Sequence, residues 1–166
     1  MLSHMPNKLI DIYRHVSGVH GFDYSRIEDD IYIGMNMCCE FGFKRELLSK
    51  GVTADISLEA ERLDAPQGVE YFLWLPTPNQ MAPTAAALEE GVQAIALLRA
   101  QGKKIYIHCK NGHGRAPTLY AAYLIRNGMS VEQALTSIAT GRSSIHLEKA
   151  QIEALRRFVQ AAPVKI

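Results

Sequence analysis

Residues 104–118 read KIYIHCKNGHGRAPT, and this stretch decides the fold. Its first five residues follow Gly102 and form a short apolar run that predicts a buried β-strand. Gly112 and Gly114 then predict a loop, and Arg115 opens an apolar segment that predicts a helix. A strand, a glycine-containing loop and a helix N-terminus in this order can bind an anion, because loop N–H groups and the helix dipole both favour negative charge.

Two reactive side chains border this predicted anion site. Cys109 stands at the carboxyl end of the strand, where a helix N-terminus and a nearby arginine favour a nucleophilic thiolate. Arg115 carries a planar guanidinium that can bind two oxygens of a phosphate group. We therefore predict a phosphate cradle with Cys109 as its nucleophile. The predicted phosphate-binding residues are Lys110, Asn111, Gly112, His113, Gly114 and Arg115.

The rest of the chain predicts short strands that alternate with helices, followed by a run of helices. We expect Pro76 to end the third strand, and Tyr71 and Trp74 to lie in the core. This order predicts an α/β fold, with a small central mixed or parallel sheet of four to five strands flanked by helices. Strands are predicted at residues 31–33, 53–58, 70–75 and 104–108, and helices at residues 44–50, 84–100, 116–126, 130–141 and 147–160.

Composition argues against several classes of protein. Among the 166 residues, the net charge of +1 gives no general attraction to nucleic acid or to an anionic membrane surface. No apolar run approaches the ~20 residues that span a bilayer, and the start lacks a signal-peptide pattern. The three cysteines, Cys38, Cys39 and Cys109, include no CxxC pair, so we expect no zinc cage, no disulfide framework and a reducing, cytoplasmic compartment. We also expect no metal, no cofactor and a monomer.

The sequence resembles the protein tyrosine phosphatase superfamily, and within it the small dual-specificity phosphatases. The signature that carries this resemblance is His108-Cys109, followed by five residues and Arg115. Three further segments resemble parts of that family: residues 29–34 its first core strand, residues 75–84 its acid loop, and residues 141–146 a late segment of the mitochondrial phosphatidylglycerophosphate phosphatase branch.

This resemblance covers about residues 24–160 and implies a dual-specificity phosphatase-like fold. We therefore divide the chain into an N-terminal segment, residues 1–22, and a single phosphatase catalytic domain, residues 23–162. The N-terminal segment has a helical pattern at residues 7–16, and its start is typical of residues left by cloning.

The resemblance implies a two-step hydrolysis of phosphate monoesters. Cys109 would attack phosphorus to form a phosphocysteine, and water would then release phosphate. Arg115 and the amides of residues 110–115 would stabilise the charge on the transferred group without a metal, and His108 would support the loop as a buried ring. The implied partner is a phosphorylated protein or a small phosphate-bearing substrate. Phosphotyrosine protein, phosphoinositide, phospholipid, inositol phosphate and RNA 5′-phosphate all stay open.

Two positions depart from the pattern of the family. Asn79 stands where the acid loop carries an aspartate, and an amide cannot donate a proton to the leaving oxygen. We therefore predict that aryl phosphates, phosphotyrosine included, are cleaved faster than alkyl phosphates, because a phenolate leaves without help. Ala116 replaces the hydroxyl residue that follows the arginine, so hydrolysis of the phosphocysteine depends on whether Thr118 can reach it. Candidates for a replacement acid are Asp55, Glu59, Glu61 and Asp64.

Other readings stay open at this point. The chain could be a phosphate-binding pseudophosphatase with little turnover, a phosphoinositide or phospholipid phosphatase, or a sulfur-transfer or thiol redox enzyme, since rhodaneses and arsenate reductases also use an anion loop that begins with cysteine. Arg142 and Gln151 could reach the pocket, but a surface ion pair and a helix-face amide are the simpler interpretations. We expect Cys38 and Cys39 to pack in the interior rather than to form a disulfide with Cys109.

Overall fold

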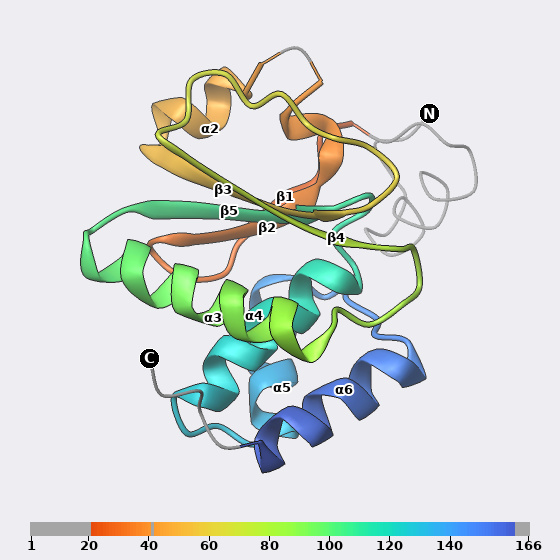
Figure 1. Cartoon of the computed structure of the whole chain (residues 1–166). Coiled ribbons are helices and arrows are strands. Elements are labelled where there is room, and N and C mark those ends of the chain that lie inside the picture. Colours follow the sequence, from red (N-terminus) through yellow and green to blue (C-terminus); the bar gives the residue numbers. More distant parts are fainter. Residues whose placement is uncertain (1–20, 41, 162–166) are drawn as a thin grey trace, which may run out of the picture.

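A five-stranded mixed sheet forms the centre of the computed structural model, which describes residues 21–40 and 42–161 (Figure 1). The strand order is β1-β2-β5-β3-β4, with β1 antiparallel to β2 and the other neighbours parallel. The central position of β5 therefore places the carboxyl end of that strand between the ends of β2 and β3. The strands are β1 (Tyr24–Arg26), β2 (Ile31–Met35), β3 (Val52–Glu59), β4 (Tyr71–Thr77) and β5 (Lys104–Cys109).

Helices cover the two faces of the sheet unequally. Four long helices, α3 to α6, lie below the sheet in Figure 1, and the short helix α2 lies above it. A further turn of 3-10 helix, η1, follows β2 directly. The helices are η1 (Asn36–Cys38), α2 (Arg45–Ser49), α3 (Ala85–Ala100), α4 (Arg115–Arg126), α5 (Val131–Gly141) and α6 (Lys149–Gln160).

Successive residues of β5 point to opposite faces of the sheet, as in any strand. Ile105, Ile107 and Cys109 pack in the core cluster shared with the long helices. Tyr106 packs in a separate hydrophobic cluster on the other face of the sheet, which α2 covers. Its ring stacks on that of His108, with 5.6 Å between ring centroids. Cys109 and His108 are neighbours in sequence, but they therefore belong to opposite sides of the sheet.

The structure agrees with the predicted α/β architecture, and within the described residues each predicted strand and helix is present with small shifts of its ends. Strand β1 was not predicted, because its three residues carry no apolar pattern and it pairs only at the sheet edge beside β2. Pro76 does not end β4, which continues to Thr77. The β4 strand is the other edge of the sheet, where the missing N–H of proline breaks no ladder hydrogen bond.

The prediction that Tyr71 and Trp74 lie in the core is wrong. Both side chains are about two-fifths exposed, at 40% and 39%, because they belong to this edge strand. Within residues 21–40 and 42–161, no helix is long and apolar enough to cross a membrane. The helix predicted at residues 7–16 falls outside the described residues.

Candidate active site

The loop between β5 and α4 begins at Cys109 and ends at Arg115. Its sharpest bend is at Gly112, whose φ of +69° favours glycine. A Cβ at this position would lie 2.4 Å from the carbonyl oxygen of Gly34 in β2, so glycine is also required for space. The loop can therefore fold tightly over the end of the sheet and return to the N-terminus of α4.

Arg142, just after α5, holds the outer side of this loop. Its Nε donates to the carbonyl oxygen of Gly112 at 2.9 Å, and its Nη2 donates to the carbonyl of Asn111 at 3.1 Å and to Asp23 at 2.6 Å. Each peptide plane sends its C=O and N–H in opposite directions, so the N–H groups of Gly112 and His113 point away from Arg142. The interpretation of Arg142 as a surface ion pair was wrong, because its side chain is buried.

A cavity of about 130 Å³ opens on the inner side of the loop. Six of the residues singled out from the sequence line it, and Gln151 does as well. Of the other predicted residues, Lys110 is exposed, while Gly112, His108 and Thr118 are buried outside the cavity lining. The lining residues are Asn79, Gln80, Cys109, Asn111, His113, Gly114, Arg115, His146, Glu148 and Gln151.

Arg115 is almost fully buried, and four oxygen atoms surround its guanidinium. Its Nη1 donates to the carbonyl oxygen of Thr77 at 2.6 Å and to Glu61 Oε2 at 2.8 Å, with the carbonyl of Leu58 at 3.5 Å. Its Nη2 lies 3.3 Å from Asn79 Oδ1. The ends of β3 and β4 therefore hold the arginine in place, and most of the contacts fall on Nη1.

Of the four candidate acids, Glu61 is the one that contacts the site, and it does so at two places. One carboxylate oxygen accepts from Arg115, and the other accepts from the backbone N–H of Asn79 at 2.6 Å. Burial opposes ionisation of Glu61, but the hydrogen bond and charge of Arg115 together with backbone hydrogen bonds outweigh it, and the pKa of Glu61 is lowered. An ionised carboxylate serves poorly as a general acid, so Glu61 is better suited to position Arg115 and the loop of Asn79.

The other three candidate acids lie outside the cavity lining. Glu59 is buried and accepts from Asn36 Nδ2 at 2.7 Å. Asp55 and Asp64 are buried beside His108, with carboxylate oxygens 3.3 Å and 3.6 Å from its Nε2. These contacts place both aspartates on the side of the sheet that faces away from the long helices. They are therefore unsuited to protonating a leaving group in the cavity.

The hydroxyl of Thr118 donates to the carbonyl oxygen of Gly114 at 2.8 Å. This is a bond to the preceding turn of its own helix, which occupies the hydroxyl hydrogen. Ala116 is fully buried in the first turn of α4 and has no hydroxyl. The Thr118 hydroxyl therefore does not take the place of the hydroxyl that the family pattern has directly after the arginine.

Gln151 links α6 to the loop that follows β4. Its Oε1 accepts from the backbone N–H of Glu148 in a capping box, and its Nε2 donates to the carbonyl oxygen of Met81 at 3.0 Å. The interpretation as a helix-face amide was therefore incomplete. The spacing from Glu148 to Gln151 is that of a capping box, which indicates the start of the helix. It does not indicate the contact with Met81.

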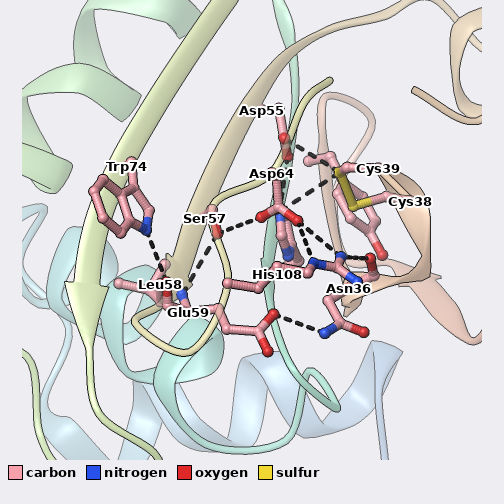
Figure 2. Close-up of polar contacts among 12 residues, drawn as sticks. Asn36, Cys38, Cys39, Asp55, Ser57, Leu58, Glu59, Asp64, Trp74 and His108 are labelled. Atoms are coloured by element: carbon pink, nitrogen blue, oxygen red, sulfur yellow. Dashed lines mark hydrogen bonds and ion pairs between the residues drawn. A yellow bond between two sulfur atoms is a disulfide. The ribbon is translucent and has the colours of Figure 1, made fainter. Parts of the chain in front are cut away.

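Behind the loop, His108 is fully buried in a polar cluster (Figure 2). Burial opposes protonation of His108, but the carboxylates of Asp55, Asp64 and Glu59 together outweigh it and raise the pKa of the ring. Burial is also the main cause that raises the pKa of Asp55. The sulfur atoms of Cys38 and Cys39 are joined in a disulfide here. Cys38 and Cys39 are buried as expected and neither is bonded to Cys109, but the disulfide between these two sequence neighbours was not predicted.

Comparison with known proteins places these features in a family context. A family model described as the dual specificity phosphatase catalytic domain matches residues 31–161. Phosphatidylglycerophosphatase and protein-tyrosine phosphatase 1 of Mus musculus is 43% identical over 92 residues, which are 55% of this chain and 48% of that protein. The chain spans about half the length of the curated relatives it matches.

Two solved structures are similar over most of the chain. The crystal structure of PTPMT1 in complex with PI(5)P has 31% sequence identity and a TM-score of 0.71, and covers 82% of this chain and 94% of that one. The crystal structure of Tk-PTP in the active form has 26% identity and a TM-score of 0.70, and covers 84% of this chain and 97% of that one.

Proposed function

Because this chain belongs to the family of dual specificity phosphatase catalytic domains, we propose that it hydrolyses phosphate monoesters through a phosphocysteine on Cys109, with a preference for aryl phosphates such as phosphotyrosine. The observation that carries the proposal is the cavity lined by both Cys109 and Arg115, at the N-terminus of α4. The family membership argues against the alternative of a sulfur-transfer enzyme.

The reaction has two displacements at phosphorus. The Cys109 sulfur forms a bond to phosphorus while the bond to the leaving oxygen breaks, and the leaving group departs as a phenolate or alkoxide that takes its proton from water. A water molecule then attacks phosphorus, the bond between phosphorus and sulfur breaks, and inorganic phosphate leaves the regenerated thiolate. The N–H groups of the loop, turned away from Arg142, and the positive end of α4 stabilise the negative charge of the transferred group in both steps.

Arg115 is suited to bind the phosphate through one edge of its guanidinium. Thr77 and Glu61 hold Nη1, so the edge formed by Nε and Nη2 can point two parallel N–H groups at phosphate oxygens. Asn79 Oδ1 now lies against Nη2, and a bound phosphate would compete for that donor. Arg115 is thus positioned before substrate arrives, which avoids the cost of ordering a long side chain during the reaction.

Asn79 determines the expected selectivity. It lines the cavity, and its amide has no proton to give to a leaving oxygen at neutral pH. General acid catalysis contributes roughly 10²–10⁴-fold, and its loss falls on leaving groups that are poor as anions. A phenol, with a pKa of about 10 like that of tyrosine, suffers less than an alkyl alcohol.

A phospholipid or phosphoinositide phosphatase is the second candidate. The names of the relatives favour it: one is a phosphatidylglycerophosphatase, and one similar structure holds PI(5)P. The phosphates of such lipids are esters of alkyl alcohols, however, and Asn79 cannot supply the proton that these leaving groups need. The two candidates therefore predict opposite orders of substrate preference.

A panel of substrates separates these functions. We expect p-nitrophenyl phosphate and a phosphotyrosine peptide to be hydrolysed with vanadate sensitivity, and a phosphoserine peptide, phosphatidylglycerophosphate and PI(5)P to be much slower. Cys109→Ser is the control and should be inactive on every substrate. A pseudophosphatase would bind phosphorylated ligands but release no phosphate from any of them, and a lipid phosphatase would reverse the order.

The second displacement should be slow, because Ala116 and Thr118 supply no hydroxyl to the departing sulfur. We expect a burst of nitrophenol, equal to the amount of enzyme, before a slower steady state. Ala116→Ser should raise the steady-state rate by about tenfold or more, which is the worth of one hydrogen bond to a charged group. Rapid-quench kinetics measure both phases. Thr118→Val is the matched control and should leave the burst unchanged, whereas a wild-type time course without a burst would contradict the expectation.

A further inference from the structure

On the face of the sheet opposite the long helices, four potential metal ligands lie together behind the catalytic loop. Cys38 comes from η1, Cys39 follows it directly, Asp55 comes from β3 and His108 comes from β5. All four side chains are buried, and one ligand atom from each lies within 4.8 Å of the others. Figure 2 shows these four side chains together, and none of them lines the cavity of Cys109.

Three of these residues are about as far apart as neighbouring metal ligands, with Asp55 turning a different carboxylate oxygen toward each of the other two. Cys39 Sγ lies 3.4 Å from Asp55 Oδ2 and 3.8 Å from His108 Nε2, and His108 Nε2 lies 3.3 Å from Asp55 Oδ1. With metal–ligand bonds of about 2.0–2.3 Å at tetrahedral angles, neighbouring ligand atoms are roughly 3.3–3.8 Å apart. The disulfide is the exception, because it brings the sulfurs of Cys38 and Cys39 closer together than two metal ligands would lie.

The two buried aspartates beside His108 differ in their partners, and this difference points to a cation at Asp55. Asp64 accepts from Ser57 Oγ at 2.8 Å and is paired with Arg62 at 2.8 Å. Asp55 Oδ1 accepts no hydrogen bond, although it is buried and faces His108. A buried carboxylate oxygen without a well-aligned donor is costly, and either a protonated His108 at 3.3 Å or a bound metal ion would stabilise it. The two cysteines beside it favour the metal, because reduced sulfurs are ligands and a protonated imidazole is not.

We propose that the reduced form of this cluster binds one zinc-like divalent cation through Cys38, Cys39, Asp55 and His108. Two thiolates, an imidazole and a carboxylate form a donor set that zinc takes in proteins, and thiolates favour it over magnesium or calcium. The site would tie the segment after β2 to β3 and β5 directly behind Cys109. It would take no part in phosphoryl transfer.

Formation of the site needs a two-electron reduction. A dithiol reductant such as dithiothreitol gives two electrons and two protons to the Cys38–Cys39 disulfide, and the reductant is itself oxidised to a cyclic disulfide. The protein then carries two thiols, and binding of the divalent cation releases their two protons as the sulfurs become ligands. A disulfide or peroxide oxidant that accepts two electrons from the two sulfurs would re-form the Cys38–Cys39 bond and release the ion.

Cobalt(II) titration tests the proposal, because thiolate ligands give bound cobalt an intense near-ultraviolet absorption and tetrahedral geometry gives visible bands. The full chain is reduced with dithiothreitol, freed of it without air, and titrated. We expect one cobalt per chain, displaced by zinc. The oxidised wild-type chain should bind none, and this comparison requires no mutation.

Variants identify the ligands. Cys39→Ser and Asp55→Asn should weaken the binding of cobalt by more than about 100-fold, while Cys109→Ser should bind it like the wild type. Circular dichroism checks the fold of each variant. The proposal is wrong if the reduced wild type binds no cobalt, or if Cys109→Ser loses it. Because Cys109→Ser is expected to lack phosphatase activity and yet to bind metal, failure of one proposal would not be mistaken for failure of the other.

Discussion

Asn79→Asp should convert the protein from a selective to a broad phosphatase. We expect kcat for alkyl phosphates, such as a phosphoserine peptide, to rise by roughly 10²–10⁴-fold, the usual contribution of a general acid. Hydrolysis of p-nitrophenyl phosphate should change far less, because nitrophenolate leaves as a stable anion. Initial rates on both substrates, measured with one preparation of each protein, give the ratio of the alkyl rate to the aryl rate, and this ratio is compared between variant and wild type.

The structure explains why one substitution can suffice. Asn79 lies in the cavity lining, and its backbone N–H is held by Glu61. The new carboxyl would lie beside Arg115 Nη2, where Asn79 Oδ1 now is. In the free protein Arg115 would lower the pKa of this carboxyl, and a bound phosphate would then compete for the guanidinium and raise it again. The kcat of the variant on alkyl substrates should therefore fall as pH rises past the pKa of this carboxyl in the substrate complex. The pH profile of the wild type should show no such decline.

Gln80→Glu is the matched control for this experiment. Gln80 also lines the cavity, one residue further along a turn in which its φ is +64°. The control adds the same charge without placing a carboxyl at the position of the family's acid, so it should leave alkyl phosphates slow. If Asn79→Asp left the ratio of the two rates unchanged, or if the wild type cleaved both classes equally well, another group would have to supply the proton.

Local signals in the sequence identified most of the fold. Gly102, the Ser130 capping box and the glycines of the 110–114 loop mark the ends of elements whose residues also carry the right apolar pattern. Such signals act within a few residues of chain, so they can be read without knowing the tertiary structure. The same property explains why the order of β5, loop and α4 could be predicted from the sequence.

The missed features depend on contacts between distant segments. Pro76 looked like a strand end because nothing in the sequence marks β4 as an edge strand. Arg142 reaches back 30 residues to Gly112, and Glu61 meets Arg115 across 54 residues. Charged side chains like these are usually solvated on a surface, and only a completed fold can bury and pair them. The same holds for Cys39 and His108, which are 69 residues apart.

Arg115→Lys should lower kcat/KM for p-nitrophenyl phosphate by about 10²–10⁴-fold. Loss of one preorganised donor to an anionic transition state costs roughly 10²–10³ in rate, and lysine loses the parallel pair that arginine supplies. An ammonium at this position would also be drawn to Glu61 and the carbonyl oxygen of Thr77, which now hold Nη1. It would then be held by those oxygens rather than directed at phosphate. Steady-state kinetics measure the loss, and we expect it mainly in kcat.

Glu61→Gln tests how much the positioning of Arg115 by Glu61 contributes, apart from the phosphate-binding N–H groups of Arg115 itself. It removes the charge that holds Nη1 but leaves Arg115 and its contact with Thr77 in place. We expect a loss of only about tenfold, as for one charge-assisted hydrogen bond. Urea denaturation of both variants checks the fold, since Arg115 is a buried charge whose removal leaves acceptors unpaired. A folded Arg115→Lys protein that kept its activity within tenfold would mean that loop amides and the helix dipole bind the phosphate without the guanidinium.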